Sequence, residues 1–198
     1  MSKVQVDTID TRSGTSTMQI GSTNTSTINI GVSGDTVNIP AGVTIANAGT
    51  ATGFGQTNTP YFFAYRGSSE QSISNGSLTV MQFNAELYDS GNCYDTSTYK
   101  FTPNVAGKYW IQATARLNTS TDCTSLQIEI FKNTSTFSRV NENNIHYTSV
   151  TSTAIIDMNG SSDYIQAKIY QDTGGSANIA YNSDNTYQTF LQGFLIAT

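Results

Sequence analysis

From residue 60 onward, apolar and polar residues alternate along most of the chain. In the longest stretch, one side carries Tyr109, Ile111, Ala113, Ala115 and Leu117, and the other carries Trp110, Gln112, Thr114 and Arg116. A period of two held this long indicates a half-buried β-strand, because a helix would mix the two sets. Turn chemistry at 103–107, PNVAG, precedes this stretch, so the pattern predicts a protein built from sheets.

The same alternation predicts further short strands between polar or glycine-containing loops. They are expected at Tyr61–Tyr65, Leu78–Asn84, Thr98–Thr102, Lys108–Asn118, Ser125–Lys132, Thr136–Asn141, His146–Ser149, Ala154–Met158, Tyr164–Tyr170, Ala177–Tyr181 and Thr189–Ile196. About ten short strands without a helix signal are typical of an all-β sandwich, of jelly-roll or immunoglobulin type. Composition does not choose between these two types.

A short unit recurs before residue 47, as TMQIG at 17–21, TINIG at 27–31, TVNIP at 36–40 and GVTIA at 42–46. Each unit is an apolar-polar-apolar triplet, and its apolar residues are too few to offset the entropy of ordering the segment in one chain. Either the segment is a flexible linker, or other chains supply the missing core. The repetition favours three copies wound about a common axis. The residues facing that axis would be Met18, Ile20, Ile28, Ile30, Val37, Ile39, Val43 and Ile45.

These patterns divide the chain into four segments. Residues 1–16 are expected to be an N-terminal anchor, 17–46 a trimeric stalk of intertwined β repeats, 47–59 a Gly/Thr/Asn-rich neck, and 60–198 a globular head. The aromatic residues support the division, because Phe54 is the only one among the first 58 residues.

The charge balance excludes several classes of partner. The net charge of −5 argues against nucleic acid and anionic membrane surfaces, both of which need a basic face. No apolar run is long enough for membrane insertion, and the first residues lack the apolar core of a secretory signal. We therefore expect synthesis in a reducing cytoplasm, with Cys93 and Cys123 as free thiols. A disulfide formed after release from the cell is the alternative.

One constellation of residues resembles the signature of the complement C1q globular-head family. It comprises Phe83-Asn84, Tyr94-Asp95, Thr98, Phe101-Thr102-Pro103, Gly107 and Tyr109, followed by Lys132-Asn133, Asp163 and a closing Gly193-Phe194-Leu195-Ile196. The resemblance implies the ten-stranded jelly roll that this family shares with tumour necrosis factor, and a trimeric head. The chain departs from the family pattern where Tyr99 replaces a glycine, and where Leu191 replaces a phenylalanine with Phe190 one place early.

A threefold stalk carrying a jelly-roll head is similar to a short bacteriophage fibre or spike. The resemblance implies a homotrimeric virion protein, made in the host cytoplasm, that docks on another virion protein through its N-terminus. The head would bind a host cell-surface molecule such as a glycan. The alternatives are a capsid-decorating head fibre with a structural role and a secreted bacterial adhesin.

Catalytic chemistry has little support in the sequence. The chain has one histidine and none of the GxSxG, HExxH or phosphate-loop motifs, so we expect no enzyme activity and no cofactor. Calcium is a weaker alternative, with Asp89, Asp95 and Asp122 as candidate ligands, because the EF-hand spacing is absent.

The aromatic residues predict a subunit interface and a recognition surface. Residues 108–118 carry large apolar groups on both sides, which a sheet with one face in water does not need. We therefore expect Phe63, Trp110 and Phe194 at a trimer interface, with stacking on sugars as the alternative. The candidate ligand-binding residues combine aromatic area with amide groups in loops. They are Tyr147, Tyr181, Asn182, Asn185 and Tyr187.

Overall fold

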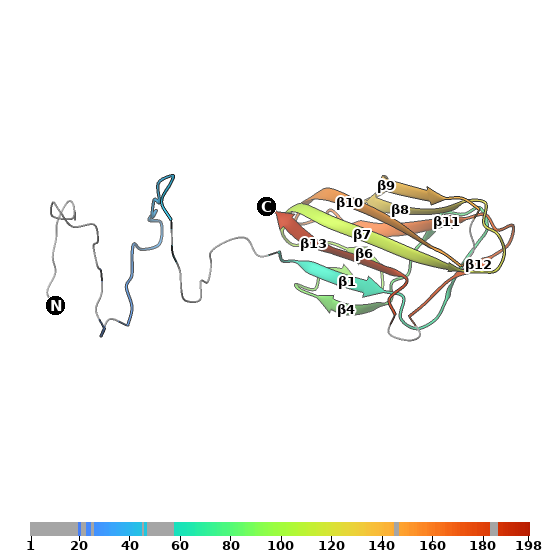
Figure 1. Ribbon diagram of the computed structural model, residues 1–198, viewed down its shortest axis with the longest axis horizontal. Helices are drawn as coiled ribbons and strands as arrows, with labels where there is room; N and C mark the ends of the chain where they lie inside the picture. The colour runs from blue at the N-terminus through green and yellow to red at the C-terminus, as the bar shows by residue number, and fades with distance from the viewer. Residues whose placement is uncertain are drawn as a thin grey trace. The chain divides into compact units, whose positions relative to one another are not determined.

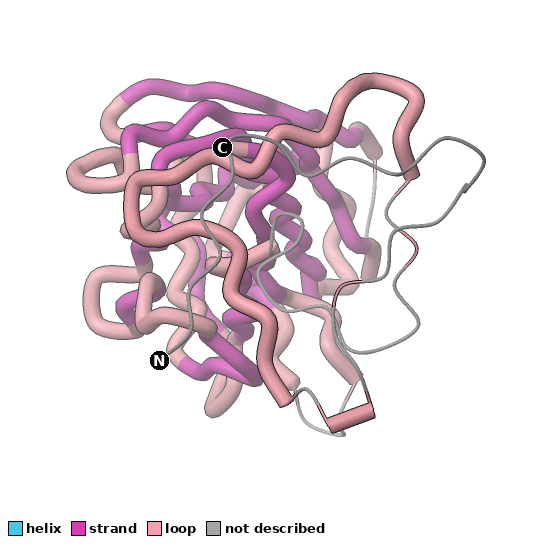
Figure 2. The backbone as a smooth tube through the Cα atoms, turned by 90° about the vertical axis from the view of Figure 1, so that its left-hand side faces the viewer, coloured by secondary structure: helices cyan, strands magenta, loops and turns pink. Residues whose placement is uncertain are grey.

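The computed structural model describes residues 20, 23–24, 26–44, 46, 58–144, 147–182 and 186–198. The chain divides into two compact units, Met1–Thr52 and Gly53–Thr198, which are treated separately below. Within the described ranges the structure contains strands and loops without a helix, as Figure 2 shows, and hence no helix able to cross a membrane.

The described part of the second unit forms strands β1 to β13 (Figure 1). Their bounds are β1 Tyr61–Tyr65, β2 Gln71–Ile73, β3 Thr79–Val80, β4 Ala85–Asp89, β5 Tyr94–Asp95, β6 Lys100–Phe101, β7 Ala106–Asn118, β8 Leu126–Lys132, β9 Ser135–Glu142, β10 Ser149–Asn159, β11 Ile165–Gln171, β12 Ala177–Ile179 and β13 Phe190–Ala197. The strands form two antiparallel sheets. The larger has the order β2-β12-β7-β13-β1-β4, with β10 also paired to β7. The smaller has the order β5-β6-β11-β8-β9, with β3 also paired to β11. The all-β fold class is confirmed.

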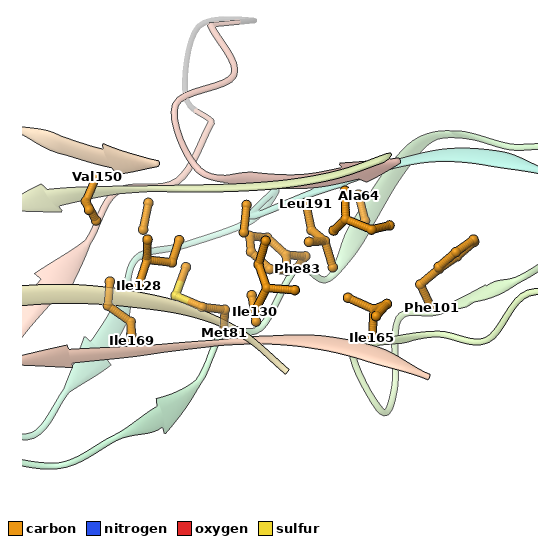
Figure 3. Close-up of a cluster of buried hydrophobic side chains, with 14 of the residues drawn as sticks. Ala64, Met81, Phe83, Phe101, Ile128, Ile130, Val150, Ile165, Ile169 and Leu191 are labelled. Atoms are coloured by element: carbon orange, nitrogen blue, oxygen red, sulfur yellow. The ribbon is translucent and has the colours of Figure 1, made fainter. Parts of the chain in front are cut away.

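The core lies between the two sheets, where the alternating residues of facing strands meet. The predicted inward residues of β7, from Tyr109 to Leu117, are all fully buried. Figure 3 shows side chains of the two sheets pointing toward one another, with Ile128 and Ile130 of β8, Ile165 and Ile169 of β11, Val150 of β10, Ala64 of β1 and Leu191 of β13 among them. The period-two prediction for these strands is therefore confirmed.

The predicted strand Leu78–Asn84 is wrong in extent, because β3 includes only Thr79 and Val80. The side chain of Gln71 explains where the ladder ends. Its Nε2 donates to the carbonyl of Val80 at 2.7 Å, and its Oε1 accepts from the Gln82 N–H at 2.9 Å. The buried side-chain amide of Gln71 thus binds the backbone groups that a neighbouring strand would otherwise pair with. Alternation along the chain does not reveal such a contact.

Other differences concern strand continuity and strand number. Of the predicted strand at 146–149, His146 lies outside the described residues and only Ser149 belongs to a strand, β10, which continues through the predicted strand at 154–158. Three strands that the alternation did not predict, β2, β4 and β5, lie at or near sheet edges. Each is five residues or shorter, so the pattern along it is too brief to be recognised.

The last strand, β13, places Leu191 in the core and Phe190 on the outer face. Leu191 is fully buried and lies opposite Ala64 of β1 and Ala113 of β7. Gly193, two residues on, also points inward, where an added Cβ would lie 2.5 Å from Cδ1 of Ile111. The one-residue offset from the family pattern thus turns the phenylalanine to the opposite face, as a period of two requires.

Asp163 joins the turn after β8 to the loop before β11. Its carboxylate forms an ion pair with the Lys132 Nζ at 2.9 Å and accepts from the Asn133 Nδ2 at 2.9 Å. The Asn133 Oδ1 in turn accepts from the Tyr164 N–H at 2.9 Å. The hydrogen bonds from Asn133 and Lys132 lower the pKa of Asp163 below its ordinary value. These residues, which contributed to the family resemblance, have a structural role.

The described part of the first unit contains turns but no strand. A turn at 32–35 is closed by the Asp35 carboxylate, which accepts from the Val32 N–H at 2.8 Å, and a second turn joins Val43 N–H to the Pro40 carbonyl at 3.2 Å. The described repeat residues Ile20, Ile28, Ile30, Val37, Ile39 and Val43 are all exposed, whereas Met18 and Ile45 lie outside the described residues. The expected β pairing is therefore absent from the described residues of a single chain. The threefold stalk remains a prediction.

Cys93 and Cys123 are both buried free thiols. Cys93 lies close to Asn104, just before β7 begins, and Cys123 follows the end of β7. A strand of this length spans about 40 Å, and a disulfide needs its two Cα atoms within about 7 Å. The structure therefore excludes a bridge between them within one chain.

Asp163→Asn should destabilise the head in a pH-dependent way. The folded-state pKa of Asp163 is lowered, so its contribution is full above the unfolded-state value of about 4 and disappears as the pH falls through the folded value. At neutral pH we expect a loss of about 2 kcal/mol in the free energy of unfolding, measured by urea denaturation at fixed protein concentration. Below pH 4, the difference in the free energy of unfolding between this variant and wild type should disappear.

The matched control for this substitution is Asp157→Asn. Asp157 also forms an ion pair, with Lys108 at 2.6 Å, but its side chain is 73% exposed. An exposed pair contributes little, so this variant should stay within about 0.5 kcal/mol of wild type. Equal losses in the two variants would contradict the structural role of Asp163.

Tyr99→Gly should be more stable than Tyr99→Ala. Tyr99 has a φ of 58° in the turn between β5 and β6, a left-handed conformation that favours glycine. The alanine variant keeps this strain while losing the ring, so we expect it to be less stable than the glycine variant by about 1 kcal/mol. Thermal unfolding of the two variants measures the difference, and a more stable alanine variant would exclude backbone strain at this position.

Candidate functional site

Aromatic side chains cover much of the outer face of the larger sheet. We call this surface the aromatic face, and it comprises Tyr61, Phe63 and Tyr65 of β1, Tyr88 of β4, Trp110 of β7, Tyr187 before β13, and Phe190 and Phe194 of β13. They share this face because β1 and β13 pair with Tyr61 opposite Phe194 and Tyr65 opposite Phe190. On the other side of β13, Phe194 lies opposite Trp110 of β7.

The rings of the aromatic face touch one another across the strands. The Trp110 and Phe194 ring centroids lie 5.4 Å apart, and those of Tyr61 and Tyr88 lie 5.6 Å apart in an edge-to-face arrangement. Phe63 stacks on Phe190 at 5.0 Å. These distances fall in the favourable range for aromatic pairs, so the face is a preformed surface.

Several of these side chains remain accessible in the single chain. Tyr61 is 42% exposed, Tyr88 44% and Phe194 37%, and Ile155 of β10, opposite Trp110, is 57% exposed. A contiguous apolar surface of this kind marks an interaction site. The structure therefore puts the predicted interface residues Trp110 and Phe194 on such a surface.

Phe63 differs from this expectation, because it is only 9% exposed. Tyr187 covers it, with ring centroids 5.1 Å apart, together with Phe190. A ring already covered by its own chain offers little area to a partner. The accessible part of the face comes instead from Phe194, Tyr61 and Tyr88, with Ile155 of β10 beside them. Strand order and register bring these residues together, and alternation along the chain does not show it.

A cavity of about 520 Å³ opens on the aromatic face. It is lined by Asn58, Tyr61, Phe62, Tyr88, Trp110, Gln192, Gly193 and Phe194. The Asn58 Nδ2 donates to the Leu195 carbonyl at 2.9 Å and so fixes one wall. Beside the aromatic residues, the Gln192 Nε2 donates to the Gln112 Oε1 at 2.6 Å. The face therefore combines a large apolar area with a few oriented amides.

Three of the candidate ligand-binding residues lie in loops at one end of the head. Tyr147 donates its N–H to the Thr119 carbonyl at 3.3 Å, beyond the end of β7, and is 52% exposed. Tyr181 and Asn182 follow β12, which lies at the same end (Figure 1). We call this the distal end, because β1 begins and β13 ends at the other end of the sandwich.

Of the other two candidates, Tyr187 packs its ring on the aromatic face, 4.9 Å from the Tyr65 ring, and its role in ligand binding stays a prediction. Asn185 lies outside the described residues. Asn182 is partly buried, donates its N–H to the Arg66 carbonyl at 2.8 Å, and turns its Oδ1 into the protein.

Each of the three aspartates proposed as calcium ligands lies in a different environment. Asp89 accepts from the Tyr94 N–H at 2.8 Å. Asp95 accepts hydrogen bonds from Ser97 and Thr98, which lower its pKa to about 2. Asp122 follows β7, at the distal end of the head. In the part of the chain that the structure describes, no group of three acidic, histidine or cysteine residues could hold a metal ion.

Among curated proteins, none matches this chain. Solved structures do: the globular domain of a zebrafish complement 1qA protein aligns at 18% identity with a TM-score of 0.48, over 70% of this chain and 98% of that one. Murine APRIL aligns at 14% identity with a TM-score of 0.51, over 69% of this chain and 98% of that one. The latter likeness supports the jelly-roll fold.

The family model of the C1q domain matches residues 61–196. The match begins at the first residue of β1 and ends one residue before the last of β13. It therefore includes both sheets, the aromatic face and the distal loops. The chain belongs to the C1q domain family.

Proposed function

We propose that the chain is the subunit of a homotrimeric virion fibre, whose C1q-domain head binds a molecule on the surface of a host cell. The aromatic face is the observation that carries the proposal, because an accessible apolar surface of this extent needs a covering partner. Domains of the C1q and tumour necrosis factor type typically form homotrimers and are non-enzymatic binding or structural domains. Two further copies of this chain are therefore the partner we infer.

The geometry of the aromatic face supports its burial between copies. Tyr61, Trp110 and Phe194 come from three adjacent strands and present rigid rings from one sheet. Aromatic residues of this kind are enriched in the buried centres of protein interfaces. Lys108 and Asp157 pair with each other at 2.6 Å near the edge of this sheet, which suits a polar rim around an apolar centre.

The repeats before the head support a threefold stalk. Ile30 is 70% exposed and Val37 57% exposed in a segment with no strand among its described residues. Turns at 32–35 and 40–43 separate the apolar triplets, and no charged residue occurs between Asp35 and Arg66. Three such chains side by side would bury the triplets against one another. In this proposal, residues 1–16 anchor the fibre to another virion protein.

The distal loops support a receptor-binding role. Tyr147 and Tyr181 are exposed at the end of the head opposite the residues that lead in from the neck. Three such ends held on one axis would act together, and linked sites gain about 10²–10⁴-fold in avidity over a single site. A weak contact per head is therefore sufficient for attachment.

Sedimentation tests the trimer. The wild-type chain should sediment at three times its mass of 21.3 kDa. Phe194→Glu would bury an unpaired charge in the interface and should yield monomers at micromolar concentration. The matched control is Phe137→Glu, because Phe137 is 50% exposed on β9 of the other sheet and should leave the trimer intact. A monomeric wild type would disprove the architecture.

Attachment is tested with the fluorescently labelled full chain on a panel of bacterial strains. We expect binding to particular strains at micromolar concentration or below, and a loss of about 10²-fold in the monomeric Phe194→Glu variant through lost avidity. Antibody labelling of intact particles locates the protein. Label at the tail supports attachment, whereas capsid label with no cell binding would indicate a decorating fibre.

A further inference from the structure

A small polar cavity lies at the distal end of the head, separate from the aromatic cavity. We call it the distal pocket. It has a volume of about 220 Å³ and is lined by Glu70, Arg116, Asn118, Ala180, Tyr181 and Gln188. Sites for drug-sized ligands measure about 300–1,000 Å³, so this pocket suits one small polar unit.

Glu70 is fixed in the pocket by amides from two different strands. Its Oε2 accepts from the Asn178 Nδ2 of β12 at 2.6 Å, and its Oε1 accepts from the Asn118 Nδ2 at the end of β7. The backbone is also held, because the Glu70 carbonyl accepts from the buried Arg66 guanidinium. Neutral amides leave the carboxylate its charge and further lone pairs, so it can accept from a ligand.

Arg116 is held on the other side of the pocket. Its Nη1 donates to the Gln188 Oε1 at 2.6 Å. Its backbone N–H donates to the Thr189 Oγ1, and its carbonyl accepts from the Ala180 N–H at 2.9 Å. A guanidinium has five N–H donors, and a single neutral amide leaves most of them for a ligand.

The two opposite charges of the pocket are not joined to each other. In the described part of the chain, neither Glu70 nor Arg116 takes part in a salt bridge. The guanidinium disfavours a metal ion, and the carboxylate disfavours a free anion such as phosphate. A ligand that donates to the carboxylate and accepts from the guanidinium satisfies both, and hydroxyl groups do this without a net charge.

We propose that the distal pocket binds one neutral saccharide unit of a surface glycan. Ring hydroxyls bridge Glu70 and Arg116, and the Tyr181 ring, which is 36% exposed at the rim, packs against the apolar face of the sugar. The biological role of this site rests on the proposed function, in which the distal end meets the host surface. The chemistry of the pocket stands independently of it.

Titration calorimetry of the full chain tests the pocket with six sugars: glucose, galactose, mannose, rhamnose, N-acetylglucosamine and N-acetylgalactosamine. We expect binding of at least one of them at millimolar concentration. Arg116→Gln, Glu70→Gln and Tyr181→Ala should each weaken it about tenfold or more, as loss of a charged hydrogen bond or a packed ring implies. Circular dichroism and sedimentation check that each variant retains the wild-type fold and assembly.

Phe137→Ala is the matched control, because Phe137 is an exposed aromatic residue on β9 of the other sheet that does not line the pocket. It should bind the sugar as wild type does. The proposal is overturned if none of the six sugars binds, if Tyr181→Ala and Arg116→Gln bind as wild type does, or if Phe137→Ala loses as much affinity as they do.

Cell binding separates failure of the pocket from failure of the proposed function. If wild type and Tyr181→Ala bind cells equally well and neither binds sugar, the receptor role stands without the pocket. If wild type binds sugar through the pocket residues but attaches to no cell in the panel, the pocket stands and the receptor role fails.

Discussion

Both faces of the sheet built around β7 must be kept from water, and most of the molecule follows from this constraint. The inner face, from Tyr109 to Leu117, is fully buried against the smaller sheet. The outer face carries Trp110 next to Phe194, and the same chain covers it only in part. The inner face is therefore covered by folding, whereas in our proposal the outer face is covered by further copies of the chain.

The residues that gave the family resemblance turn out to maintain the fold. Asp163 connects two loops through Lys132 and Asn133, and the Tyr94 hydroxyl donates to the Phe83 carbonyl inside the core. Burial raises the pKa of Tyr94 far above its ordinary value, so it remains a neutral hydrogen-bond donor. Such residues identify the family without indicating what its members bind. The binding site that we propose lies where the signature residues are absent, in the distal loops.

The two ends of the head differ in the polarity of their cavities. Near the first residue of β1 and the last of β13, the cavity on the aromatic face offers apolar area. At the distal end, the pocket between Glu70 and Arg116 is polar and held by amides. An apolar surface suits a permanent partner of fixed shape, and a polar pocket suits a hydroxylated ligand that binds and dissociates. The assembly and the recognition that we propose would therefore use different cavities of one sandwich.

The sequence by itself determined the all-β class, the inward residues of the long strands, and the outward positions of Trp110 and Phe194, because a period of two assigns a face directly. Tertiary structure alone decided that Tyr61, Tyr88 and Ile155 join them, since strand order and register bring these residues together. It also placed the Tyr187 ring against Phe63 and Tyr65 of the aromatic face. Of the distal pocket, the sequence indicated only Tyr181, because Glu70, Arg116 and Gln188 lie far apart in the sequence and come together only through long-range strand pairing. Alternation along a strand determines which face of the sheet each side chain occupies. A site built from several strands depends on their long-range pairing, so it exists only in the folded chain.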